Sequence, residues 1–181
     1  SYNNQWGVPL SLARMPRDTM YAVFEIGMNH PGEISPLVKM VRPHVAIITT
    51  VEPAHLEYFT SIEAIADAKA EIFDGLEPDG VAILNHDNNQ FGRLQKAALK
   101  SGAKVVSFGA GSGADVHLDR LALHANCSCV SATLLDQAAT YKIGMAGEHW
   151  ALNSLAVLTA VQSLGADVGL ATMALASMEA P

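Results

Sequence analysis

Glu25 and His55 have the side chains, and the placement along the chain, that metal chemistry requires. Glu25 ends an apolar run, residues 21–26, that reads as a buried strand, and His55 follows a second, β-branched run, residues 44–51. The carboxyl ends of parallel strands meet at one edge of a sheet, where ligands bind. A carboxylate beside an imidazole suits a divalent cation such as Mg²⁺ or Mn²⁺. Taken singly, Glu25 is equally well explained as a solvated strand tip, and His55 is better explained as a solvated loop residue.

Lys69 is a third candidate because it falls on the apolar face of a predicted helix. That helix covers residues 60–75 and opens with a capping box in which Thr60 is the cap and Glu63 reaches back. A buried ammonium is costly unless its charge is paired or removed, although a lysine can also extend outward to solvent. A neutral lysine amine can take up CO₂ and become a carbamate, an anion able to bind metal. The spacing permits this chemistry without showing it.

Asn85 and Asp87 form the polar tip of a third predicted strand, residues 80–85. They should share the sheet edge of Glu25 and His55. Asn153 lies near the start of a predicted helix that opens at Gly147, where backbone donors and the helix dipole favour anions. Taken alone, an asparagine at that position is more often a surface amide.

The glycine-rich stretch of residues 109–113 has some features of a phosphate loop, but it fails the test of context. It lacks the Lys-Ser/Thr pair, and β-like runs follow it in place of a helix. We therefore predict a flexible turn.

The alternation of apolar runs and amphipathic segments predicts an α/β fold: a mostly parallel sheet with helices on both faces. A small antiparallel sheet is predicted from three later runs. The predicted strands are 20–26, 44–51, 80–85 and 103–108, the antiparallel runs are 116–125, 128–135 and 139–145, and the helices cover 33–41, 60–75, 90–100, a long stretch from 147, and 167–178.

Composition narrows the class of protein. The chain has 181 residues, of which 50% are hydrophobic and 16% charged, as expected for one globular domain. Its formal net charge of -7 argues against a nucleic-acid or anionic-lipid partner. Cys127 and Cys129 form a single C-x-C pair, which predicts reduced thiols in a cytoplasmic protein and no zinc site. The ends read as cut from a longer protein.

Six ordered motifs together resemble one family. They are N-N-x-x-G-V-P-L-S-L from Asn3, E-I-G-M-N-H-P-G-E-I from Glu25, A-H-L-E-Y-F from Ala54, A-K-A-E-I-F from Ala68, N-H-D-N from Asn85 and G-E-H-W-A-L-N-S-L-A from Gly147. Residues 3–161 thereby resemble the central domain of the Mur ligases, whose fold is P-loop NTPase-like. Within that family the motifs look most like the branch that joins D-alanyl-D-alanine to UDP-N-acetylmuramoyl-tripeptide.

The resemblance implies an ATP-dependent amide-bond ligase of peptidoglycan precursor synthesis, working through an acyl phosphate. It implies that Glu25 and His55 bind Mg²⁺ and that Lys69 is carbamylated and helps to hold the ion. ATP would be bound by Asn153, which faces the adenine, and by Asn85, Asp87 and His149. Substrate would be bound by Asn3, Asn4, Asn29 and His30.

Two departures from the family pattern matter. The motif H-N-x-x-N reads His149-Trp150-Ala151-Leu152-Asn153, so Trp150 replaces its first asparagine and weakens the adenine assignment. The P-loop is absent; the resemblance places it upstream of Ser1, with a UDP-binding domain before it and a C-terminal domain after Pro181. We therefore expect the 181 residues alone to be inactive and the complete protein to be a monomer.

Other functions remain open on the sequence. One is another Mur-type or cyanophycin-synthetase-like ligase. A second, of a different class, is a small metal-binding α/β hydrolase that uses Glu25 and His55 and needs no nucleotide. A third is a non-catalytic binding module that kept the fold.

Overall fold

The computed structural model describes residues 2–53 and 58–179. One six-stranded sheet, with its strands in sequence order, organises this part of the chain. β1 (Val45–Ile48), β2 (Val81–Asn85) and β3 (Lys104–Gly109) are parallel neighbours, with Val45 opposite Val81 and Val81 opposite Lys104. The parallel sheet predicted from the alternating pattern is confirmed.

The antiparallel strands are a continuation of the same sheet. β4 (Val116–Leu123), β5 (Ser128–Leu134) and β6 (Gln137–Ile143) form a meander, and the start of β4 pairs in parallel with the end of β3. The Asp115 carboxylate accepts hydrogen bonds from the backbone N–H and the hydroxyl of Ser107, at 2.8 and 2.7 Å. These bonds fold the short connection back and bring Val116 beside Phe108. The predicted antiparallel strands are therefore confirmed, and they join the parallel strands in one sheet.

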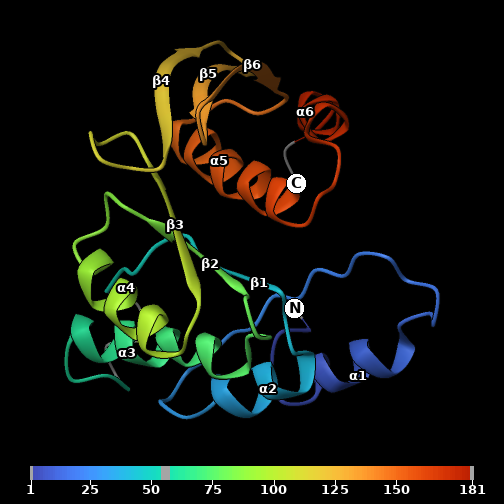
Figure 1. Ribbon diagram of the computed structural model, residues 1–181, viewed down its shortest axis with the longest axis vertical. Coiled ribbons are helices and arrows are strands. Elements are labelled where there is room, and N and C mark those ends of the chain that lie inside the picture. The colour runs from blue at the N-terminus through green and yellow to red at the C-terminus, as the bar shows by residue number, and fades with distance from the viewer. Residues whose placement is uncertain (1, 54–57, 180–181) are drawn as a thin grey trace.

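Helices cover both faces of the sheet (Figure 1). One face carries α2 (Ile34–Val41), α3 (Ile62–Ala70) with the 3-10 helix η1 (Glu71–Gly75), and α4 (Phe91–Lys100). The other face carries the long α5 (Glu148–Ser163), and α6 (Val168–Ala176) packs against β6. α1 (Gly7–Arg14) lies beside α2.

The core has one apolar cluster on each face of the sheet. On the side of α3 and α4, Ile65 and Leu94 pack with Ala82 and Leu84 of β2. On the side of α5, Leu155 and Leu158 pack in a cluster with Ile83, Phe108 and strands of the antiparallel half. Alternate residues of β2 thus face opposite clusters, as expected for a strand buried on both faces.

The segment of residues 21–26, predicted as the first buried strand, is not a strand. It has no regular secondary structure and pairs with no strand in the described part of the chain, and Val23 is 98% exposed. An apolar run becomes a buried strand only where a neighbouring strand pairs with it. Here the edge strand β1 lies on the other side of a cleft from this segment, so the two do not pair.

At the start of α1, the Asn4 side chain accepts hydrogen bonds from the amides of Trp6 and Gly7. In α3 the N-cap is Ser61, whose hydroxyl accepts from the Ala64 amide at 3.2 Å, and not Thr60. In the described part of the chain, no helix combines the length and the apolar character needed to span a membrane.

Candidate functional site

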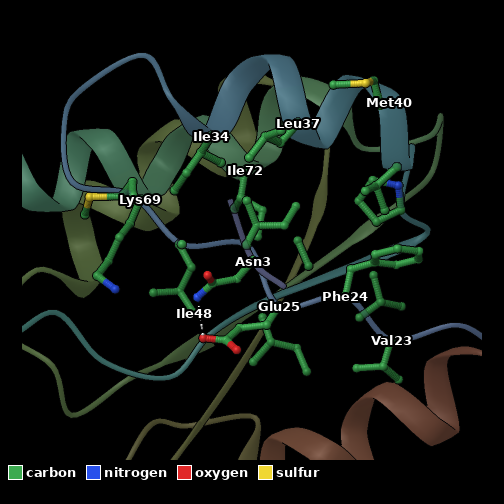
Figure 2. Close-up of a pocket in the computed structure, with 18 of the residues that line it drawn as sticks. Asn3, Val23, Phe24, Glu25, Ile34, Leu37, Met40, Ile48, Lys69 and Ile72 are labelled. Carbon is green, nitrogen blue, oxygen red and sulfur yellow. Dashed lines mark hydrogen bonds between the residues drawn. The ribbon is translucent and has the colours of Figure 1, made fainter. Parts of the chain in front are cut away.

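A cleft of about 1620 Å³ runs between residues 20–29 and β1. α2 covers it with Ile34, Leu37 and Met40, and Val23 and Phe24 line the opposite side (Figure 2). Two of the predicted site residues, Glu25 and Lys69, lie in this lining, together with Asn3, Asn4 and Asn29. The structure therefore gathers residues from three of the sequence motifs around one space.

Glu25 is held from the N-terminal segment. The Asn3 side-chain amide donates a hydrogen bond of 3.0 Å to Oε1 of Glu25, drawn as a dashed line in Figure 2. The Gly27 amide donates to the Asn3 carbonyl at 2.9 Å, and a Cβ on Gly27 would lie 2.8 Å from Asn3 Nδ2. The close approach needs glycine, and it fixes the backbone directly after Glu25.

Lys69 enters the cleft from the last turn of α3 (Figure 2). Its side chain is partly buried, and this burial lowers the pKa of its amine below the ordinary value of 10.5. The expectation that Lys69 lies on the buried side of its helix is confirmed. A lowered pKa increases the fraction of neutral amine, which is the form that can react with CO₂.

Asn29 and His30 lie in a tight turn built on Glu33. The Glu33 carboxylate accepts from the amides of Asn29 and His30, at 2.7 and 3.2 Å, and contacts the His30 ring nitrogen at 3.0 Å. The Asn29 amide is the main cause that lowers the pKa of Glu33 below 4.5, followed by the His30 side chain. The His30 ring contacts the ring of Tyr58, with centroids 4.6 Å apart. His55, the other predicted metal ligand, lies outside the described residues.

Asn85 and Asp87 shape the adjoining sheet edge. Asn85 donates to the Thr49 carbonyl, which follows β1, and accepts from the Asp87 amide, both at 2.9 Å. Asp87 in turn accepts from the amides of Ala110 and Gly111, at 2.6 and 2.9 Å. Hydrogen bonds to Asp87 therefore fix the turn that was predicted to be flexible. The sequence signal for this is the pair Gly109 and Gly111, because a Cβ on either residue would lie within 2.7 Å of the Asp87 carboxylate.

His149 and Asn153 lie on α5 and outside the lining of the cleft. α5 begins after Gly147, whose φ of 141° is strained for other residues. His149 is exposed and its ring contacts that of Trp150, with centroids 4.9 Å apart. Asn153 is half-buried in the second turn. Neither residue shares the space of Glu25 and Lys69.

Glu71 is a residue whose role sequence reasoning missed, although it belongs to the motif A-K-A-E-I-F. Its carboxylate accepts from the amides of Gly32, Ile34 and Ser35, at 2.5, 3.1 and 3.1 Å, and so holds the start of α2. No local pattern predicts this bond, because its partners are more than 30 positions earlier in the chain.

The described residues of the cleft do not by themselves make a complete metal site. In residues 2–53 and 58–179 no group of three or more His, Cys, Asp or Glu side chains could hold a metal ion. Glu25 supplies one carboxylate, oriented by Asn3. Lys69 as an ammonium would repel a cation, whereas a carbamate on the same side chain would add oxygen ligands of the kind Mg²⁺ prefers.

Comparison with known proteins gives the family. The model of the Mur ligase middle domain matches residues 1–161. The chain belongs to this family. The UDP-N-acetylmuramoyl-tripeptide–D-alanyl-D-alanine ligase of Rickettsia prowazekii is 35% identical over 98% of this chain and 40% of its own length. The ligase of the same name from Escherichia coli is 34% identical over 98% of this chain and 39% of its own length.

Solved structures agree with the fold of this Mur ligase domain. A crystal structure of MurF from Acinetobacter baumannii superposes with a TM-score of 0.93 at 30% identity, covering 100% of this chain and 39% of that chain. MurF from Thermotoga maritima, solved in complex with ADP, superposes with a TM-score of 0.84 at 27% identity, covering 98% of this chain and 40% of that chain. The chain thus spans about two fifths of the relatives it matches.

Proposed function

We propose that this chain is the central domain of an ATP-dependent ligase that joins D-alanyl-D-alanine to UDP-N-acetylmuramoyl-tripeptide. The observation that supports the proposal most is the cleft, where Glu25 and Lys69 lie together in a member of the Mur ligase middle domain family. The names of the two curated relatives described above supply the two substrates. The complete protein would phosphorylate the tripeptide carboxylate with ATP, and the amine of the dipeptide would displace phosphate from the acyl phosphate.

Residues of this chain would hold the metal ion and bind the substrate. Mg²⁺, when bound, would neutralise phosphate charge, on which phosphoryl transfer depends. Glu25, oriented by Asn3, and the carbamate of Lys69 would hold the ion together with His55. The carbamate forms when the neutral Lys69 amine adds to the carbon of CO₂ and releases one proton. Asn29 and His30, fixed by Glu33, would bind substrate, with Asn3 and Asn4 on the same side.

The nucleotide would lie along the neighbouring sheet edge. Asn85 and Asp87 would place the glycine-rich turn of residues 109–113 there, and His149 and Asn153 would approach the adenine from α5. The ADP bound by the Thermotoga maritima relative supports a nucleotide site in this fold. Trp150 would offer an aromatic face where the family motif has an amide.

The open cleft would be filled by a further strand of the longer protein, and the P-loop would follow that strand. Three features support this: β1 is an edge strand of the described sheet, the apolar segment of residues 20–26 is not part of that sheet, and the cleft between them is lined mainly by apolar side chains. The UDP-binding and C-terminal domains would also lie outside these 181 residues. We place the complete protein, as a monomer, in the cytoplasm, where its nucleotide substrates occur.

The test is a ligation assay with the complete protein. We expect formation of ADP, phosphate and the UDP-N-acetylmuramoyl-pentapeptide only when ATP, Mg²⁺, the tripeptide substrate and D-alanyl-D-alanine are all present. An amide bond formed with a different amine and not with D-alanyl-D-alanine would assign the chain to another Mur-type ligase. Hydrolytic activity that needs no nucleotide would contradict the proposal.

A further inference from the structure

Glu71 is bonded to two walls of the cleft at once. Its backbone N–H donates to the carbonyls of Ala68 and Lys69, at the end of the helix that presents Lys69. Its carboxylate accepts from the amides of Gly32, Ile34 and Ser35, where the turn that carries Asn29 and His30 enters α2. One residue therefore connects two elements that both line the cleft.

The start of α2 needs this distant acceptor. The N-cap residue Glu33 makes no side-chain cap to its own helix, because its carboxylate is bonded to the amides of Asn29 and His30. The first amides of a helix have no partner within the helix, and a negative charge is favoured beside them. Glu71 supplies both the acceptor and the charge from 37 positions further along the chain.

The joint between the two elements is closely packed as well as hydrogen-bonded. A Cβ on Gly75, at the end of η1, would overlap the backbone of Val38 in α2. Ile72 of η1 and Leu37 of α2 both line the cleft. The carboxylate of Glu71 therefore acts at a junction where the backbones of η1 and α2 already touch.

We propose that Glu71 is a positioning residue, which fixes the turn of residues 29–33 relative to Lys69 across the cleft. The inference rests on the proposed function, since it gives that function a residue that sets the geometry of substrate binding. It assigns Glu71 no contact with substrate or metal. Its effect passes through the amides that it holds.

The two oxygens of Glu71 have different partners, and this makes the proposal testable. Oε1 takes the Gly32 amide, which belongs to the turn, and Oε2 takes the amides of Ile34 and Ser35, which belong to α2. Glu71→Gln retains one carbonyl oxygen. We expect this oxygen to accept from the two amides of Ile34 and Ser35, because two hydrogen bonds are stronger than one. The –NH₂ group of the glutamine then faces the Gly32 amide, so only the hydrogen bond to the turn is lost.

The first experiment is residue-resolved amide hydrogen exchange on the complete protein. In Glu71→Ala we expect exchange at Gly32, Ile34 and Ser35 to accelerate about tenfold or more, and in Glu71→Gln at Gly32 alone. Asp74→Asn is the matched control, because it removes an exposed acid from the same 3-10 helix, and it should change none of the three. Unchanged exchange at all three amides in Glu71→Gln and Glu71→Ala would overturn the proposal, and Glu71→Gln decides it alone if Glu71→Ala does not fold.

The second experiment separates positioning from simple helix capping. We expect Glu71→Gln to raise KM for UDP-N-acetylmuramoyl-tripeptide about tenfold, with a smaller change in kcat and an almost unchanged melting temperature. A residue that only caps α2 would leave KM unchanged in Glu71→Gln, and that result would also overturn the proposal. Absence of ligation by the wild-type protein would contradict the proposed function instead, and the exchange measurement would still decide whether Glu71 holds the turn.

Discussion

The side-chain amide of Asn3 donates to the carboxylate of Glu25 across 22 positions of sequence, at 3.0 Å. A backbone hydrogen bond links the same two segments, because the Gly27 amide donates to the Asn3 carbonyl. Asn4, the next residue, points its side chain elsewhere and caps α1. Two adjacent asparagines of one motif therefore have separate tasks: Asn3 holds the Glu25 carboxylate, and Asn4 holds the start of α1.

Asn3→Ala should raise the Mg²⁺ concentration needed for half-maximal ligation by the complete protein. Loss of one hydrogen bond to a charged group costs about 1.5–3 kcal/mol, which corresponds to a shift of roughly tenfold or more. Mg²⁺ titrations of the ligation rate measure it. Asn4→Ala is the comparison: it should weaken α1 without changing the Mg²⁺ dependence, and an equal shift in both variants would contradict the separate tasks.

Lys69→Ala should reduce ligation by the complete protein by about 100-fold or more, because a charged group at the phosphates is lost. Added short-chain carboxylic acids should partly restore the rate by occupying the place of the carbamate. Lys69→Arg should not restore it, since guanidinium keeps its positive charge and does not carry CO₂ in this way. Near-normal activity of Lys69→Arg would end the carbamate hypothesis.

Glu33 should make stability depend on pH in the acid range. The pKa of Glu33 is lowered from 4.5 in the folded protein. Its stabilising contribution is therefore complete above pH 4.5 and is lost as the pH falls through the lowered pKa. Urea unfolding of the complete protein should give wild type a higher free energy of unfolding than Glu33→Gln at neutral pH. This difference should close below pH 4.5. Asp74→Asn controls for the change in net charge, and a gap that widens in acid would show the sign to be wrong.

Ser128→Ala should destabilise the protein by about 1–3 kcal/mol, because it leaves buried polar groups without a partner. The Ser128 hydroxyl is fully buried, donates to the Met145 carbonyl at 2.9 Å and accepts from the Gly147 amide at 3.2 Å, at the start of α5. Denaturant unfolding measures the loss. Ser131→Ala, in the same strand but with its hydroxyl on Thr140 in an exposed pair, should cost less than about 0.5 kcal/mol.

Residues 1–181 alone should neither hydrolyse ATP nor form amide bonds, while the complete protein does both. Phosphoryl transfer depends on positioning and on charge neutralisation at the phosphates, and the 181 residues contain no P-loop sequence to supply them. Parallel assays of the two proteins for ADP release and product formation test this. Ligation by the 181 residues at a rate near that of the complete protein would contradict it.

Local sequence patterns predicted most of the elements correctly. α2, β1, β2, α4 and β3 lie where apolar periodicity and turn residues placed them, because a helix or strand buries a face whose spacing is written along a few consecutive residues. The same spacing predicted the position of Lys69 on the buried side of α3. The order of strands and helices was sufficient to predict a parallel sheet.

Contacts between distant segments were decided only by the tertiary structure. The sequence alone determined most element types, the parallel half of the sheet and the candidate residues Glu25 and Lys69. The tertiary structure decided that residues 21–26 stay outside the sheet, that β3 continues into β4 as one sheet, and that Asp87 and Glu71 each hold amides far from them in sequence. The physical reason is that an acceptor can satisfy any amide that the fold brings to about 3 Å, and which amide that is depends on the packing of whole elements.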